Sequence, residues 1–233
     1  ANSSTDINTN ITTFPITAYG IVWQAIFLGD GTQQVSLTDV IITAEPDTSN
    51  PTPPTSLTVT DSESGTDELV SDTWYLHEEP YFSWSGATDI GDAGVGGYCV
   101  YFGQDADAIP CSEGVGEFQE ESYYVPESMT SGTVYYFRVQ TKDNAQNTST
   151  LYPEAGPFIY KFDNRGPSLP GTVSVSPPGY TAVNEYTFLW PSSGVSMAKD
   201  CTAPNICSGL AGYQYKIEED GEWSDTITQT EIV

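Results

Sequence analysis

The chain has 233 residues, a formal net charge of −26 and only six lysine and arginine residues. Nucleic acid and anionic membrane surfaces are disfavoured as partners, because both are bound by cationic patches. Charged residues make up only 16% of the chain, and its polarity comes mainly from Thr, Ser, Gly and Asn, which favour strands and turns over helices. We therefore expect an all-β protein with no membrane span in this segment.

The negative charge is concentrated in the first part of the chain. No lysine or arginine precedes Arg138, whereas 21 of the 32 acidic residues do. Internal salt bridges cannot neutralise such a segment, so salt, bound cations or a basic partner must screen it. A solvated surface in a salty extracellular medium and a divalent-cation site both remain open.

Residues 1–45 carry the signal of a β-hairpin. An apolar run at 19–28 is followed by a Gly-Asp-Gly turn and by alternating apolar residues at 35–42. This pattern resembles the closing strands of jelly-roll modules in secreted bacterial proteins, so 1–45 are expected to be the C-terminal strands of a truncated β domain. Residues 46–54 hold four prolines and are predicted to be an extended, semi-rigid linker.

An internal repeat follows the linker. The sequence Phe-Ser-Trp at 82–84 returns as Phe-Leu-Trp at 188–190, and Gly-Tyr at 97–98 returns at 212–213. The two tryptophans are 106 residues apart, about the length of one sandwich domain. Only 20 residues follow Tyr213, so the missing strands are expected from a longer chain or a partner subunit. The predicted units are a sandwich at 55–162, a linker at 163–170 and an incomplete sandwich at 171–233.

The sandwich residues resemble the fibronectin type III family. Trp84 and Tyr98 match its strand B tryptophan and strand C tyrosine, and the stretch 132–139 matches its tyrosine corner. The stretch 143–149 is similar to the Asp-x-Ala-Gly-Asn-x-Ser ending of bacterial members. The segment 60–80 and the cysteines depart from that pattern, so the immunoglobulin-like class stays open. The resemblance implies spacer, adhesive or binding modules without chemistry of their own.

Alternating apolar residues predict which side chains form the core. Phe-x-Trp and the later Tyr-x-Phe-x-Val place large side chains on one face of each strand, because the side-chain period of a strand is two. The expected core is Trp84, Tyr98, Tyr135, Phe137 and Val139, with Trp190 and Tyr213 as counterparts in the second unit.

Four cysteines form two sequence-local pairs, Cys99 with Cys111 and Cys201 with Cys207. Zinc sites prefer closer cysteine pairs, often with histidine, and the single histidine, His77, lies far from any cysteine. We therefore predict two disulfides in preference to a zinc site, and disulfides imply an oxidising, extracellular compartment.

A calcium site is the more specific interpretation of the acidic clusters, because calcium prefers carboxylate, amide and carbonyl oxygens. Asx turns would explain the same residues without a metal. The candidate calcium ligands are Asp89, Asp92, Asp143, Asn144, Asp163 and Asn164.

Two aromatic pairs lie among acidic, turn-rich residues and are candidates for an exposed binding surface: Trp74-Tyr75 and Tyr123-Tyr124. No catalytic motif occurs, and one histidine excludes most histidine-dependent triads, so no enzyme activity is expected.

The sequence thus predicts a non-catalytic, structural or adhesive spacer segment of an extracellular cell-surface or filament protein. Its partners would be other domains of the same chain or neighbouring subunits, and glycans. The alternative is an accessory, carbohydrate-binding region of a secreted polysaccharide-active enzyme.

Overall fold

The computed structural model describes residues 46–91, 93–180, 182, 185–191, 197–200, 207–216, 221–225, 227–228 and 231–232. Contacts divide the chain into two units, 1–45 and 46–233. The jelly-roll-like strands predicted at 1–45 lie outside the described residues, as do the predicted ligand Asp92 and the predicted disulfide partner Cys201.

All regular elements in the described part of the chain are strands, which confirms the all-β class. That part holds no helix with the length and apolarity to cross a bilayer. The strands are β1 (Ser56–Thr60), β2 (Thr73–Tyr75), β3 (Tyr81–Ser85), β4 (Val95–Gly103), β5 (Glu117–Gln119), β6 (Tyr123–Tyr124), β7 (Thr133–Asp143), β8 (Phe158–Phe162), β9 (Ser174–Ser176), β10 (Thr187–Leu189) and β11 (Glu231–Ile232).

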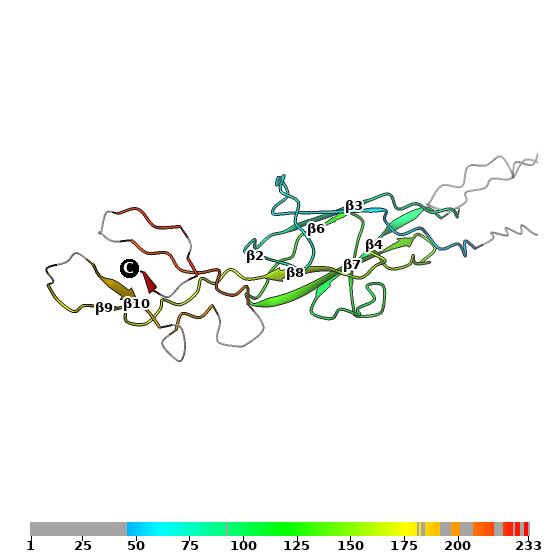
Figure 1. Cartoon of the computed structure of the whole chain (residues 1–233). Coiled ribbons are helices and arrows are strands. Elements are labelled where there is room, and N and C mark those ends of the chain that lie inside the picture. The colour runs from blue at the N-terminus through cyan, green and yellow to red at the C-terminus, as the bar shows by residue number, and fades with distance from the viewer. Residues whose placement is uncertain are drawn as a thin grey trace, which may run out of the picture. The chain divides into compact units, whose positions relative to one another are not determined.

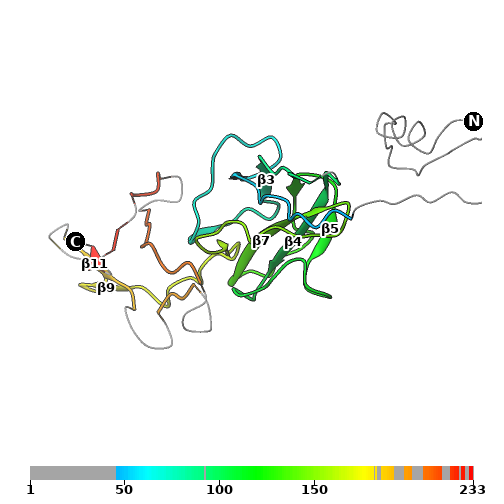
Figure 2. The same ribbon diagram turned by 90° about the vertical axis from the view of Figure 1, so that its right-hand side faces the viewer.

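Strands β1 to β8 form two sheets that face each other. One sheet has the order β1-β3-β6 and the other the order β2-β8-β7-β4-β5. Figure 1 shows β3 and β6 in one layer and β7 and β8 in the other, and Figure 2 shows β7, β4 and β5 side by side. The first edge of the larger sheet is made by β2, which pairs with β8 in parallel, whereas the other pairs are antiparallel.

The core lies between these two sheets and follows the alternation of the strands. Trp84, Phe137 and Val139 are buried, and Tyr98 packs against the same cluster while half-buried. Phe82 stacks on Phe137 with ring centroids 4.4 Å apart. The burial of apolar side chains at every second position of β3 and β7 supplies the main driving force for closing the two sheets.

Two local features fasten the larger sheet. The hydroxyl of Tyr135 accepts a hydrogen bond of 2.7 Å from the backbone amide of Thr130, five residues upstream, which is the contact that defines a tyrosine corner. The predicted disulfide between Cys99 and Cys111 is confirmed, and it ties β4 to the loop that leads to β5. Cys207 is also disulfide-bonded, and its predicted partner lies outside the described residues.

Strands β9, β10 and β11 form a separate antiparallel sheet. In it Val175 lies opposite Phe188, just as Val59 lies opposite Phe82 between β1 and β3. Trp190 follows β10 and is buried, like Trp84 in β3. The repeat found in the sequence therefore returns as the same strand pairing with the same register.

Candidate functional site

The first candidate site includes a tight loop at the end of β7. The carboxylate of Asp143 accepts hydrogen bonds from the backbone and side-chain amides of Asn147, at 2.7 and 2.8 Å. Between them, Gln146 adopts a φ of 76°. Asp143 is only 1% exposed, so this loop holds a buried carboxyl group at one end of the sandwich.

Two further carboxylates converge on Asp143 from distant parts of the chain. Asp89 lies in the loop between β3 and β4, and its oxygens accept from the backbone amides of Gly91 and Gly94. Asp47 lies in the proline-rich segment and accepts from the backbone amides of Ser49 and Ala93. Carboxylate oxygens of Asp47, Asp89 and Asp143 all lie within 4.8 Å of one another. We call these three residues the carboxylate cluster.

The electrostatics of the carboxylate cluster set two effects against each other. Ionised carboxylates this close together repel one another, so each disfavours the charged form of the others. Hydrogen bonds from the backbone amides of Ala93 and Ser49 act in the other direction and hold the pKa of Asp47 below its ordinary value of 3.8. The cluster offers hard oxygen ligands to one cation.

The structure brings together only part of the predicted ligand set. Of the six predicted residues, Asp89 and Asp143 meet in the cluster. The side-chain amide of Asn144 donates to the backbone oxygens of Ala93 and Gly94, so it braces the neighbouring loop. Asp163 and Asn164 follow β8 and lie at the opposite end of β7, because Phe162 pairs with Thr133 there.

Asp163 instead connects the sandwich with the segment that follows it, and we call this connection the joint after β8. Its carboxylate accepts from the hydroxyl of Ser131 in the sandwich at 2.8 Å, and from the backbone amide and hydroxyl of Ser208, both at 3.0 Å. Asn164 beside it donates to the carboxylate of Glu78. Burial alone would raise the pKa of Asp163, but these hydrogen bonds and one from Arg165 outweigh burial and lower the pKa from 3.8.

The two predicted aromatic pairs differ in their surroundings. Tyr75 stacks on Tyr160 with ring centroids 5.6 Å apart and packs against the core, and its hydroxyl is hydrogen-bonded to the backbone of Val70. Trp74 is half-buried. Tyr123 is 44% exposed and stacks on Tyr81, whereas Tyr124 is half-buried.

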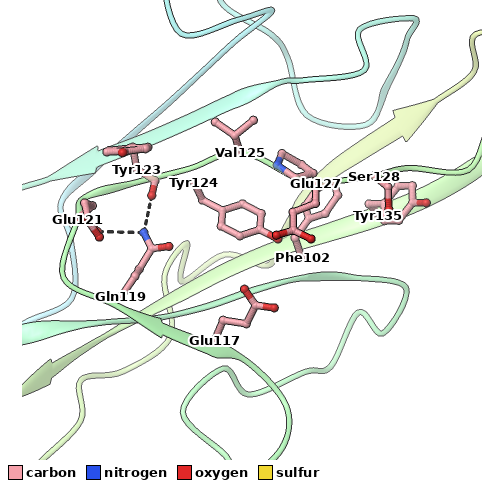
Figure 3. Close-up of a pocket in the computed structure, with 11 residues that line it drawn as sticks. Phe102, Glu117, Gln119, Glu121, Tyr123, Tyr124, Val125, Glu127, Ser128 and Tyr135 are labelled. Carbon is pink, nitrogen blue, oxygen red and sulfur yellow. Dashed lines mark hydrogen bonds between the residues drawn. The ribbon is translucent and has the colours of Figure 1, made fainter.

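Tyr123 and Tyr124 line a pocket of about 540 Å³ between the two sheets (Figure 3). Its other walls include the rings of Phe102 and Tyr135 and the glutamates Glu117 and Glu127. The Gln119 side-chain amide donates to the backbone oxygens of Glu121 and Tyr123, which ties β5 to the start of β6. We call this cavity the tyrosine pocket.

Several residues of these sites were not singled out from the sequence, among them Asp47, Glu117 and Glu127. Asp47 lies in the proline-rich segment, directly after a proline. An acidic residue in a stiff segment next to a domain is the signal that could have indicated Asp47. Glu117 and Glu127 flank the predicted Tyr123-Tyr124 pair at short sequence distance. Among 32 acidic residues, neither position stands out without the fold.

Comparisons with models of protein families, with curated proteins and with solved structures find no match for this chain. The chemistry of these sites and the way the segments are joined are the features that bear on function.

Proposed function

We propose that the chain is a non-catalytic spacer segment of an extracellular multi-domain protein. In this proposal, β-sandwiches of the fibronectin type III or immunoglobulin-like kind follow one another and hold other domains at a fixed spacing. The observation that carries it is the attachment of the proline-rich segment to the sandwich, because a spacer transmits position only if its linkers do not swing freely.

That attachment is made at successive points along the segment. Asp47 is fixed by Ala93, and its backbone oxygen accepts from the side-chain amide of Asn147 at 3.1 Å. Thr52 exchanges backbone and side-chain hydrogen bonds with Thr88. Thr55 donates its amide to the backbone oxygen of Ser85. The prolines stiffen the chain between these contacts, since their backbone φ is fixed.

The far end of the sandwich supports the same interpretation. Asp163 joins the Ser131 loop to Ser208, so the segment after β8 is also held by side-chain hydrogen bonds. The shared register of Val59 with Phe82 and of Val175 with Phe188 supports a second sandwich of the same type after this joint. The Cys99–Cys111 disulfide supports an oxidising, extracellular location.

The test measures the backbone mobility of the proline-rich segment in the whole chain by heteronuclear ¹⁵N relaxation. We expect the amides of Asp47, Ser49, Thr52 and Thr55 to give the same heteronuclear NOE values as β4. The double variant Asp47→Ala/Thr52→Val removes the side-chain anchors and should lower these values. Thr48→Val is the matched control, because Thr48 is exposed and makes no hydrogen bond among the described residues. Low values in the wild-type chain would overturn the proposal.

A further inference from the structure

The tyrosine pocket lies where the edges of the two sheets meet. Strand β5 is the last strand of the five-stranded sheet, and β6 is the last strand of the three-stranded sheet. Besides Phe102 of β4 and Tyr135 of β7, the pocket is lined by β5, β6 and the chain that follows β6 as far as Ser128. A ligand can reach this position from solvent without opening the core, because edge strands have no neighbour on one side.

The carboxylates in this pocket have no partner of their own. Glu117 and Glu127 are exposed, and in the described part of the chain neither side chain forms a hydrogen bond or an ion pair. Figure 3 shows both carboxylates near the ring of Tyr124, that of Glu117 from β5 and that of Glu127 from the loop that follows β6. No lysine or arginine is among the described residues that line the pocket. The pocket therefore presents negative charge next to aromatic rings.

The polar groups of the pocket favour a ligand that donates hydrogen bonds. Carboxylates can only accept hydrogen bonds. The side-chain amide of Gln119 already donates both of its hydrogens to the backbone oxygens of Glu121 and Tyr123. Burial, followed by the charges of Glu117 and Glu127, raises the pKa of Tyr124. Aromatic ring faces add attraction for cations through their quadrupoles.

We propose that the tyrosine pocket binds an organic cation, a primary ammonium or guanidinium group of the kind carried by lysine and arginine side chains. Glu117 and Glu127 would neutralise the charge, and the rings of Tyr124 and Phe102 would contact the alkyl stem. Phe102 is held in place for this by stacking on Tyr135, with centroids 4.8 Å apart. The volume of about 540 Å³ admits such a side chain together with part of its backbone. In a strongly acidic chain, this site would give a basic partner one specific point of attachment.

The test is calorimetric titration of the whole chain with N-acetyl-lysine methylamide and its arginine analogue. The neutral isostere, N-acetyl-norleucine methylamide, and the disaccharide cellobiose are titrated in parallel. We expect the two cations to bind, their affinity to fall with rising sodium chloride, and the neutral compounds to give no binding. NMR shifts on lysine addition should centre on the amides of Glu117 and Tyr124.

Two double variants separate the pocket from the overall charge. Glu117→Gln/Glu127→Gln should weaken lysine binding by about five- to tenfold, as expected for losing two partly exposed ion pairs. Glu113→Gln/Glu120→Gln removes the same charge from exposed residues of the same stretch outside the lining, and it should change the affinity less than about twofold. Equal losses in both variants would overturn the proposal, and so would equal binding of the norleucine compound.

Further ligands distinguish the source of the cation. A Gly-Gly-Lys-Gly-Gly peptide that binds more tightly than n-butylammonium would indicate a basic polypeptide partner, whereas equal affinities would indicate a small amine. Cellobiose binding with shifts at Tyr124 would overturn the cation proposal and favour a carbohydrate-binding region instead.

Discussion

The ring centroids of Trp190 and Tyr213 lie 5.4 Å apart, and the same distance separates the ring centroids of Trp84 and Tyr98. In both pairs the tyrosine directly follows a glycine with a φ near 155°, Gly97 at 152° and Gly212 at 157°. Trp84 and Trp190 are both buried, and neither indole nitrogen has a hydrogen-bond partner among the described residues. The sandwich of β1 to β8 and the segment that follows it therefore share this detail of packing as well as a sequence pattern.

Trp84 is the first place to test the core. Trp84→Ala should cost about 3–5 kcal/mol in the free energy of unfolding, because a large buried side chain leaves a cavity. Trp84→Phe should cost clearly less, because it also removes a buried donor that has no partner. Calorimetry of the full chain measures both, with Trp223→Ala as the control at a residue that is 61% exposed. An Ala variant as stable as the Phe variant would contradict the assigned core.

Gln146 tests the loop that holds Asp143. Its φ of 76° lies in the left-handed region, which glycine adopts without a steric penalty. We expect Gln146→Gly to stabilise the protein by about 0.5–1 kcal/mol. Ala145→Gly is the matched control in the same loop, where no positive φ offsets the extra freedom of the unfolded chain, so it should destabilise. A melt in which both variants move in the same direction would refute this expectation.

Asp163 makes the joint after β8 sensitive to acid. Its folded-state pKa is lowered from 3.8, so its contribution to stability is complete above the unfolded value and is lost as the pH falls through the lower folded value. Carbon-detected NMR titration should therefore give a midpoint below 3.8 for the Asp163 carboxylate. Below that pH, the amide of Ser208 should lose its protection from exchange. In Asp163→Asn this acid dependence should vanish, whereas Glu113→Gln should retain it.

Calcium can now be tested at a defined place. If the carboxylate cluster binds calcium, millimolar calcium chloride raises the melting temperature more than sodium chloride at the same ionic strength. Asp89→Asn should abolish the difference, while Asp107→Asn should keep it, because Asp107 is exposed and lies outside the cluster. Coincident wild-type curves in the two salts would show that the acids form only a screened surface.

Much of the sandwich could be predicted because its signal is local. The alternation through Tyr135, Phe137 and Val139 identifies a buried face within one strand, and the short spacing of Cys99 and Cys111 suggested their pairing. Strand β2 carries no such signal. Its three residues, Thr73–Tyr75, form a strand only because they pair in parallel with β8.

The carboxylate cluster shows the same limit for a site. Asp47 and Asp143 are 96 positions apart, and they meet because the proline-rich segment folds back along the loop that contains Thr88 and Ala93. No short window of sequence contains that contact. The tyrosine pocket likewise requires β5 and β6 to lie at the edges of different sheets, which is a property of the topology.

The Cys99–Cys111 bridge has a mechanical consequence for a segment that is pulled from both ends. The two residues are 12 positions apart in sequence, and the bridge keeps their Cα atoms 5.2 Å apart. The same stretch of open chain would reach roughly 40 Å at full extension. Forced unfolding of the oxidised sandwich therefore releases roughly 35 Å less chain than that of the reduced one. The redox state of the surroundings thus sets how far this segment lengthens under tension.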